Sequence, residues 1–550
     1  MTASSGVGST GTVSTATRAN PWAVLIVVSL GFFMTLLDLT IVNVAIPNMI
    51  LRLHASLDDV LWVINAYALV LAVLLITAGR LGDLFGQRTI FFAGIALFTV
   101  ASAACGFAPS AGWLIAFRAV QGLGAALLMP QTLAILTMVF PPERRGAAFG
   151  IWGAVAGIAT IAGPTLGGLL VTAFDWRYIF FINLPIGIAV LILTVVVIPD
   201  LRTERKHSFD VSGVLLASGA LLALCYALVE GQRYNWGTVK SFISIPLIFA
   251  VGFVLLVTFL VVQARTQDRE PLLPFSLFKE RNYSLMNVVS ACISIGMLGI
   301  FLPFTIYLQD VLGFSALKAG LTMAPASVVA MFVAPVAGRM TDKIGGKFIL
   351  LTGLVLFACG MGAIALIAQT TSAWYDFLAP QFFAGIGIGC TFAPLTTIAM
   401  RNVQPMMAGA ASGVFNTTRQ VGTVIGTAGV GALLQNRLIA GFTSQIHTLA
   451  GHLPAAEQQT LISSFQAAAK SGLTGGPGQH STGLGAEIFT RGFVEGMRPT
   501  MLVPIAFLFI GAACCLLIKR RARTPEAAAE QRVGEASAAV ADAPTAAPAS

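Results

Sequence analysis

The sequence predicts an all-α integral membrane protein with two six-helix bundles and two extra helices between them. Of its 550 residues, 56% are hydrophobic and only 10% are charged, whereas a soluble protein carries roughly 25% charged residues. The apolar residues gather in fourteen long runs, and a short polar motif in the first half of the chain returns in the second half. Repeated bundles of this kind are typical of secondary transporters.

Each apolar run is long enough to cross a bilayer as a helix. Helices are expected because a backbone in lipid must satisfy its own hydrogen bonds, and the alternating short segments of a β-barrel are absent from the sequence. The predicted spans are residues 22–47, 59–79, 89–109, 113–138, 147–173, 178–199, 210–230, 240–263, 284–308, 316–337, 348–369, 375–400, 406–434 and 498–518.

The repeated motif occupies residues 79–88 and 338–347, after the second and tenth predicted spans. A carboxylate near the start of the next helix is favoured by the helix dipole, and the terminal cation of each copy is expected to bind a carboxylate or a helix C-terminus. We expect both copies to control conformational change. The matching residues are Gly79, Arg80, Asp83, Gly86 and Arg88 in the first copy, and Gly338, Arg339, Asp342, Gly345 and Lys347 in the second, each 259 positions later.

Eight spans separate the two copies, which is two more than a pair of six-helix bundles requires. Spans seven and eight, between charged linkers, are therefore predicted to be an inserted pair. The expected organisation is a disordered N-terminus (1–21), a first bundle (22–200), the inserted pair (201–265), a linker (266–283), a second bundle (284–518) with an external loop (435–497), and a disordered tail (519–550).

The net charge of +9 is interpreted as a topology signal rather than as a nucleic-acid surface. Lys and Arg concentrate on the side that holds both motif copies, so this side and both termini are predicted to be cytoplasmic. The expected partners are the cytoplasmic membrane and small molecules, and no nucleic acid is expected. The chain is expected to act as a monomer. Binding to a periplasmic adaptor protein is left open. The seven cysteines lie in apolar runs without metal or disulfide spacing. We find no nucleotide-binding loop or nucleophile elbow, so no metal, no cofactor other than protons and no enzyme activity are predicted.

Asp38 is the strongest candidate for chemistry, because it lies midway along the first predicted span. A carboxylate at that depth is costly and usually marks a proton or substrate path. Since burial favours the neutral form of a carboxyl group, we expect Asp38 to exchange protons near neutral pH and, when charged, to attract a cationic substrate. Arg118, in the fourth span, is expected to pair with carbonyl groups or to tune a nearby acid. A structural role is the alternative for both residues.

The fifth span contains closely spaced glycines, among them Gly157, Gly163 and Gly167, together with Pro164. Glycines four residues apart let neighbouring helices approach closely, and a proline removes one backbone donor and favours a bend. Ordinary packing and a bend used in conformational change are both left open.

Aromatic and polar residues in several spans are candidates for contacts with an amphipathic ligand, because such pockets combine apolar walls with a few polar groups. Interfacial anchoring or structural roles are the alternatives. The candidates are Asn43, Trp62, Asn65, Tyr67, Phe301, Tyr307, Asn416 and Arg419, in addition to Asp38.

These motifs resemble those of the major facilitator superfamily and, within it, the fourteen-span drug:proton antiporter family. Residues 79–88 resemble the cytoplasmic loop signature, residues 37–47 the motif of the first span, 118–124 that of the fourth, 157–168 the antiporter motif, and 176–187 a further family stretch. The resemblance implies the major facilitator fold. It also implies that Asp38 and Arg118 take part in proton coupling and that Gly163, Pro164, Asp83 and Arg88 serve conformational change. The second motif departs from the pattern at residues 340, 341 and 347.

The predicted function is therefore proton-coupled export of amphipathic or lipophilic, cationic small molecules: multidrug efflux. A dedicated exporter of one metabolite or antibiotic is the first alternative, and a membrane sensor or scaffold that does not transport is the second.

Overall fold

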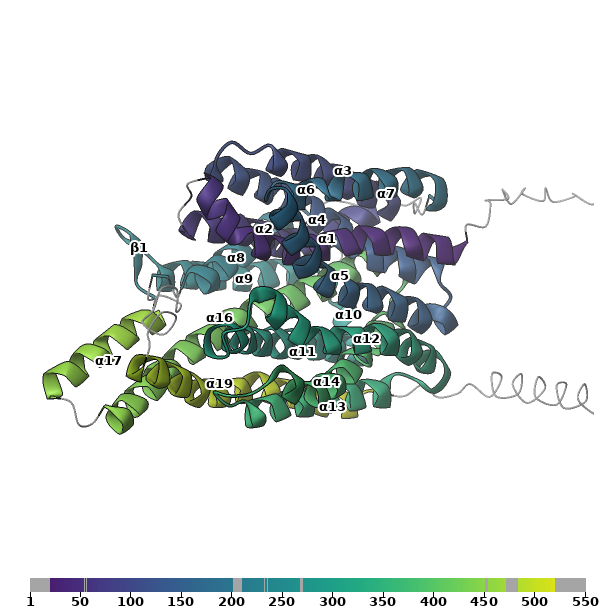
Figure 1. Cartoon of the computed structure of the whole chain (residues 1–550). Helices are drawn as coiled ribbons and strands as arrows, with labels where there is room; N and C mark the ends of the chain where they lie inside the picture. The colour runs from purple at the N-terminus through teal and green to yellow at the C-terminus, as the bar shows by residue number, and fades with distance from the viewer. Residues whose placement is uncertain are drawn as a thin grey trace, which may run out of the picture.

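The protein is an almost entirely helical bundle (Figure 1). The computed structural model describes residues 20–519 apart from 54, 56, 201–209, 232, 235, 268–270, 451–453 and 471–482. The predicted disordered N-terminus and C-terminal tail, much of the 201–210 linker and the centre of the 435–497 loop lie outside the described residues.

A first half of the bundle, residues 21–197, and a second half, residues 281–516, lie side by side (Figure 1). The first half contains α1 (Pro21–Leu53), α2 (Leu57–Phe85), α3 (Gln87–Gly106), α4 (Ala111–Val139), η1 (Pro142–Arg144), α5 (Arg145–Ala173), α6 (Tyr178–Phe181) and α7 (Asn183–Val197). The second half contains α11 (Arg281–Ile306), η3 (Tyr307–Val311), α12 (Ala316–Ile344), α13 (Lys347–Ile367), η4 (Trp374–Phe377), α14 (Leu378–Gly389), α15 (Phe392–Met400), η5 (Pro405–Met407), α16 (Ala408–Leu449), α17 (Ala455–Lys470) and α19 (Leu484–Leu516).

Within the described residues, 12 helices are long and apolar enough to cross a membrane. The fourteen spans predicted from the sequence include two helices, α5 and α16, that are not among these 12. Both are long, with 29 residues in α5 and 42 in α16, and α16 carries the polar residues Arg419 and Gln420 in its first third.

The two repeated motifs lie largely within helices, not in the polar segments between spans that the sequence suggested. Asp83 belongs to the last turn of α2, and Asp342 to the last turn of α12. Each helix continues through its motif until a glycine, Gly86 or Gly345, turns the chain with φ of 90° and 86°. Residues other than glycine rarely adopt such angles, so the two glycines set where each helix ends. We call the end of the bundle that holds Asp83 and Asp342 the hinge end.

At the hinge end, the halves meet through two helix pairs, α5 with α12 and α2 with α16. Glycines bring the backbones together in both pairs. A Cβ atom at Gly79 would lie 2.9 Å from the Gly413 Cα, and one at Gly150 would lie 2.6 Å from the Ala334 carbonyl oxygen. The halves therefore pack backbone against backbone at two matching places.

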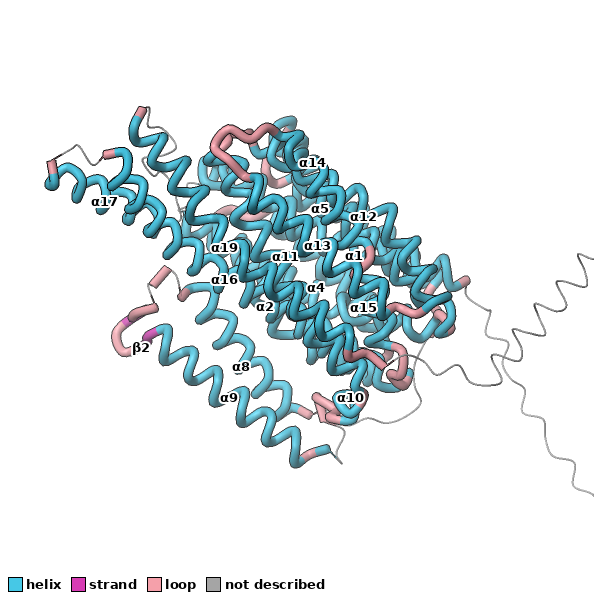
Figure 2. The backbone as a smooth tube through the Cα atoms, turned by 90° about the horizontal axis from the view of Figure 1, so that it is seen from below, coloured by secondary structure: helices cyan, strands magenta, loops and turns pink. Residues whose placement is uncertain are grey.

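An additional helix pair, α8 (Val211–Glu230) and α9 (Ile245–Arg265), lies on one side of the bundle (Figure 2). A two-stranded antiparallel ribbon, β1 (Thr238–Lys240) with β2 (Ile243–Ser244), joins the two helices, and α8 contacts α2 and α16. The short α10 (Ser276–Lys279) leads into α11. Asp210 caps α8 and also accepts a hydrogen bond from Gln263 on α9, at 2.5 Å.

The 435–497 segment, predicted to be an external loop, is largely helical where it is described. The first part continues α16 as far as Leu449, a separate helix α17 follows, and the last part opens α19 at Leu484. Apolar contacts hold this region together, since Phe442 of α16 stacks on Phe489 of α19 with ring centroids 5.7 Å apart and packs against Phe465 of α17 at 5.2 Å.

Candidate functional site

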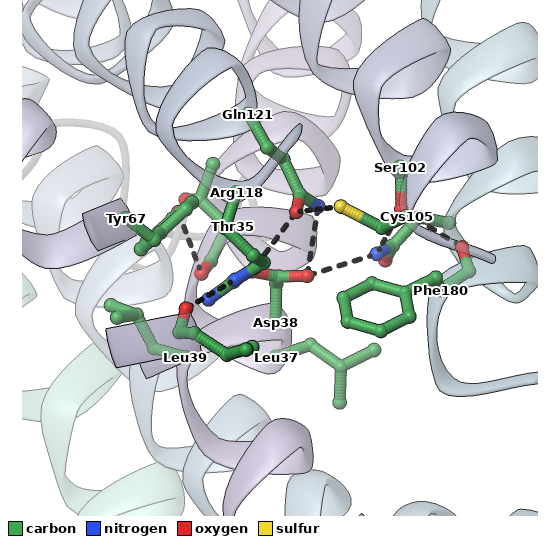
Figure 3. Close-up of polar contacts among 12 residues, drawn as sticks. Thr35, Leu37, Asp38, Leu39, Tyr67, Ser102, Cys105, Arg118, Gln121 and Phe180 are labelled. Atoms are coloured by element: carbon green, nitrogen blue, oxygen red, sulfur yellow. Dashed lines mark hydrogen bonds and ion pairs between the residues drawn. The ribbon is translucent and has the colours of Figure 1, made fainter. Parts of the chain in front are cut away.

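Asp38, in the middle of α1, is fully buried and forms an ion pair with Arg118 of α4 (Figure 3). The sequence pointed to both residues, and the structure brings them into direct contact. Because a buried cation and a buried carboxylate each require compensation, the pair supplies to each residue the partner that lipid and apolar side chains cannot.

Arg118 is held in place by more than its carboxylate. Its Nε donates to the Val63 carbonyl oxygen of α2 at 3.0 Å, and its Nη1 donates to Gln121 Oε1 at 2.8 Å. The guanidinium also lies over the Tyr67 ring, 4.3 Å from the centroid, where the electron-rich face attracts a cation. The planar fork of arginine serves three neighbours at once, which a lysine at this position could not do.

Two amide side chains complete the shell of Asp38. Gln121 Nε2 donates to Asp38 Oδ1 at 2.9 Å, and Asn183 Nδ2, at the start of α7, donates to the same oxygen at 3.3 Å. Asn183 also reaches Ser102 Oγ at 3.1 Å, and Ser102 donates to the Phe180 carbonyl oxygen at 2.9 Å (Figure 3). We call Asp38, Arg118, Gln121, Asn183 and Ser102 the carboxylate cluster.

The sequence did not indicate three of these residues as site residues. Gln121 and Asn183 lie in the stretches 118–124 and 176–187 that resemble family motifs, and Ser102 lies in neither. All three are fully buried, and the available signal was a polar side chain inside an apolar run, which is costly unless it has a partner.

The cluster surrounds the buried carboxylate of Asp38 with one guanidinium and two amide donors. Separating a buried pair costs about 3–5 kcal/mol, so a proton that neutralises Asp38 would also release Arg118 from its main electrostatic partner. The contacts of Asp38 therefore join α1, α4 and α7.

The predicted ligand contacts of the first half are spread over several environments. Tyr67 is fully buried beside Arg118 and donates weakly to the Thr35 carbonyl oxygen at 3.5 Å. Trp62 packs on Tyr226 of α8, with ring centroids 5.9 Å apart. Asn65 is half-buried, and Asn43 is exposed and bonded to the Leu39 carbonyl oxygen of its own helix.

The predicted ligand contacts of the second half also do not form one cluster. Tyr307 is fully buried and donates to the Gln369 carbonyl oxygen at 2.5 Å, which indicates a structural role. Phe301 is half-buried on α11. Asn416 is buried on α16 and donates to the Ser412 carbonyl oxygen at 2.9 Å, while Arg419, one turn further along, is half-buried.

Asp83 joins the two halves at the hinge end. Its carboxylate oxygens accept one hydrogen bond each from the backbone N–H groups of Gly409 and Ala410, both at 2.8 Å. These groups open α16, whose positive dipole end stabilises the charge. The sequence correctly suggested a helix N-terminus but the wrong helix, since the partner is α16 rather than the adjacent α3. We call this contact the first clamp.

Asp342 makes the same contact in the opposite sense. Its oxygens accept from the N–H groups of Gly146 and Ala147 at the start of α5, at 2.7 and 2.8 Å. We call this contact the second clamp. In the first clamp the first half caps the second, and in the second clamp the second half caps the first, so the interface is doubly closed at this end.

The cations that end the two motifs also play matching parts. Arg88 donates to the Val195 carbonyl oxygen at the end of α7 at 2.7 Å, and Lys347 donates to the Leu516 carbonyl oxygen at the end of α19 at 2.6 Å. Both therefore bind helix C-termini, one of the two partners expected from the sequence. The motif arginines differ, since Arg80 is buried and Arg339 is exposed.

A second repeat, which the sequence reasoning missed, supplies the partners of both clamps. Residues 146–150 read Gly-Ala-Ala-Phe-Gly, and residues 409–413 read Gly-Ala-Ala-Ser-Gly. The offset of 263 differs by four from that of the aspartate motifs, so a search at one fixed offset does not find it. A Cβ at Gly146 would lie 2.5 Å from Asp342 Oδ1, which explains the need for glycine there.

The glycines of α5 serve two different contacts. A Cβ at Gly163 or Gly167 would strike Thr40 or Ile41 of α1, so both let α1 and α5 approach closely beside the carboxylate cluster. Gly157 faces α12 with ordinary van der Waals spacing, 3.4 Å to the Ser327 carbonyl oxygen. Pro164 lies inside α5, and its side chain is outside the described set. Across the described residues, no group of three or more His, Cys, Asp or Glu side chains could hold a metal ion.

Comparison with known proteins agrees with this architecture. The family model described as the Major Facilitator Superfamily matches residues 28–427. The tetracenomycin C resistance and export protein of Streptomyces glaucescens is 35% identical over 94% of each chain. The multidrug resistance protein Stp of Mycobacterium tuberculosis is 35% identical over 88% of this chain and 90% of that protein.

Among solved structures, the human organic anion transporter MFSD10 superposes with a TM-score of 0.55 at 13% identity, covering 89% of this chain and 99% of that chain, which indicates a shared fold. The predicted family membership is confirmed: the chain belongs to the Major Facilitator Superfamily and is a membrane transporter, not an enzyme.

Proposed function

We propose that the protein is a proton-coupled antiporter that exports amphipathic or lipophilic small molecules, drugs or antibiotics, across the cytoplasmic membrane. The names of the relatives support export: one is a resistance and export protein for tetracenomycin C and another a multidrug resistance protein. The observation that carries the proton coupling is the buried carboxylate cluster, in which Asp38 is ion-paired inside a helix bundle with no exposed surface.

The hinge end is proposed to face the cytoplasm, with both termini on that side, because Lys and Arg concentrate there. With α5 and α16 counted as spans, the chain would have fourteen. The two clamps then close the cytoplasmic side, so this conformation would correspond to a carrier closed toward the cytoplasm. Breaking four charge-assisted hydrogen bonds would be required to open it.

The proposed cycle joins these two elements. Protonation of Asp38 would weaken the pair with Arg118, loosen α1 against α4 and α7, and change the stability of the clamped state. One charge that crosses about 100 mV is worth about 2.3 kcal/mol, which supports roughly a fifty-fold concentration ratio of cargo.

The sequence predicted a cationic cargo because a deprotonated Asp38 could attract it. In this conformation Asp38 is enclosed and has three side-chain partners, so direct contact with cargo gains no support from the geometry. Cationic cargo remains a prediction. Action as a monomer also remains a prediction, and a periplasmic adaptor stays an open question.

A dedicated exporter of one antibiotic is the second candidate. It is favoured by the end-to-end match to the tetracenomycin C export protein, which covers 94% of both chains. A panel of toxic compounds tested on expressing cells distinguishes the candidates, because a dedicated exporter protects against one chemical class only.

The proton-coupling proposal is tested by Asp38→Asn in everted membrane vesicles with an imposed pH gradient. We expect the variant to insert at wild-type levels and to lose gradient-driven transport, while a protonophore abolishes transport by the wild type. Full gradient-driven transport by Asp38→Asn would overturn the proposal.

A further inference from the structure

A second set of polar residues lies in the half of the protein opposite Asp38, on the adjoining helices α11 and α16. Its charge is Arg419, which is half-buried in the first third of α16. Within the described part of the chain, Arg419 has no hydrogen bond or ion pair to another residue. A cation buried in a membrane span without an anionic partner is energetically unfavourable, so an anion from outside the protein would stabilise Arg419.

The level of Arg419 relative to α11 follows from two glycine contacts. A Cβ at Gly422 would lie 3.0 Å from the Ala291 Cα, and one at Gly426 would lie 2.8 Å from the Ile295 Cα. The two helices therefore run parallel at an offset of 131 residues, and Arg419 lies level with residue 288 of α11, between Asn287 and Ser290.

That level of α11 carries buried polar atoms without partners. Ser290 is 1% exposed and Asn287 is 5% exposed. The Ser290 hydroxyl and the Asn287 Oδ1 have no hydrogen-bond partner among the described residues. Leaving a buried polar group unpaired costs about 1–3 kcal/mol, so two such atoms beside a lone cation indicate a site that a ligand completes.

No carboxylate of these two helices can neutralise the cation, because neither α11 nor α16 contains an Asp or Glu. The buried carboxylate of the other half, Asp38, is already paired with Arg118. The donors on offer are a guanidinium and a hydroxyl, which suit an oxyanion, and the acceptor is Asn287 Oδ1, which suits a neighbouring hydroxyl of the same ligand.

We propose that Arg419, Ser290 and Asn287 form the cargo-binding site for an organic anion that carries a hydroxyl group next to its charged oxygen, as an ortho-hydroxy acid does. The assignment rests on the proposed transport function and gives it a substrate class: anionic rather than cationic cargo. The two halves then divide the work, since the first half carries the proton on Asp38 and the second half binds the charge of the cargo.

The test measures binding of three fluorescent probes to the purified full-length protein: an ortho-hydroxynaphthoate, its carboxamide and the parent naphthoate without the hydroxyl. We expect the hydroxy acid to bind at least about tenfold more tightly than the carboxamide, as loss of a charge-assisted hydrogen bond predicts. Arg419→Met should abolish this preference, Arg419→Lys should retain part of it, and Ser290→Ala with Asn287→Leu should remove the preference for the hydroxyl.

Arg437→Met is the matched control, because Arg437 is exposed on α16 and lies eighteen residues, five helical turns, after Arg419 on the same face. Equal binding of acid and carboxamide, absence of binding by both acids, or an unchanged preference in Arg419→Met would each overturn the site. Gradient-driven export in vesicles is measured separately. If the carboxamide is still exported by Arg419→Met, the antiporter proposal stands regardless of this result.

Discussion

The two clamps make the closed state of the hinge end quantitatively testable. Asp83→Asn keeps one carbonyl oxygen for the start of α16 but loses the second acceptor and the charge. One hydrogen bond to a charged group is worth about 1.5–3 kcal/mol, and a charge at a helix terminus about 0.3–2 kcal/mol. Since an amide retains part of this, we expect the closed state to lose about 2 kcal/mol, which is roughly a thirty-fold shift of the equilibrium.

Asp342→Asn should shift the same equilibrium in the same direction but less, because Asp83 is buried whereas Asp342 is half-buried. The clamps share no residues, so the double variant should show the sum of the two free-energy changes. Near-complete opening of the hinge end is expected when both are replaced.

The assay is a distance distribution between spin labels at positions 85 and 344, where Phe85 and Ile344 are exposed at the hinge ends of α2 and α12. The exposed Cys359 is first replaced by serine. Asp175→Asn is the control, since Asp175 pairs with Arg177 away from both clamps. An unchanged distribution in the double variant, or a shift equal to that of the control, would refute the clamp interpretation.

Three further changes follow from individual contacts. Gly146→Ala should open the hinge end and lower export at least about tenfold, because the added Cβ atom would lie 2.5 Å from the Gly338 carbonyl oxygen. Gly168→Ala on the same helix is the control and should export normally, since no atom lies within 4 Å of the position of its Cβ atom. Arg118→Lys should reach wild-type membrane levels but lose at least about tenfold in export, measured in vesicles, since lysine cannot serve Asp38, Val63 and Gln121 together. Asp210→Asn should lower the melting temperature of the purified protein at pH 7 and make that temperature less sensitive to acid. Burial alone would raise the pKa of Asp210, but hydrogen bonds from Gly213, Gln263 and Ser212 have the larger effect and hold the pKa below its usual value. The stabilisation is present above the unfolded pKa of about 4 and is lost as pH falls through the folded value; an equal acid response of variant and wild type would contradict this.

The helices were predictable because the signal for each is local. Apolar runs of span length indicate where the helices lie, and the motifs that contain Asp83 and Asp342 share residues at one constant offset. Helix ends were less predictable: α16 extends well past residue 435 because apolar contacts with α17 and α19 continue beyond the hydrophobic run.

The partners of the functional residues could not be predicted in the same way, because they depend on which helices meet. Asp83 precedes α3 in the chain but caps α16, which begins 325 positions later at Ala408. Gln121 and Asn183 reach Asp38 only because the fold brings α4 and α7 against α1. Asn287 and Ser290 are candidates for ligand binding because the Asn287 Oδ1 and Ser290 Oγ atoms are buried without hydrogen-bond partners among the described residues. A sequence alone does not reveal such unpaired atoms.

We propose that Asp38 releases a proton when cargo binds and takes up a proton when cargo leaves. Infrared difference spectroscopy on the reconstituted transporter tests it most directly, with Asp38→Asn as the reference, by following the carbonyl band of a protonated carboxyl group as pH and cargo concentration change. We expect a band that appears on acidification, weakens when cargo is added and is absent from Asp38→Asn. A spectrum without such a band, or one that neither pH nor cargo changes, would contradict it.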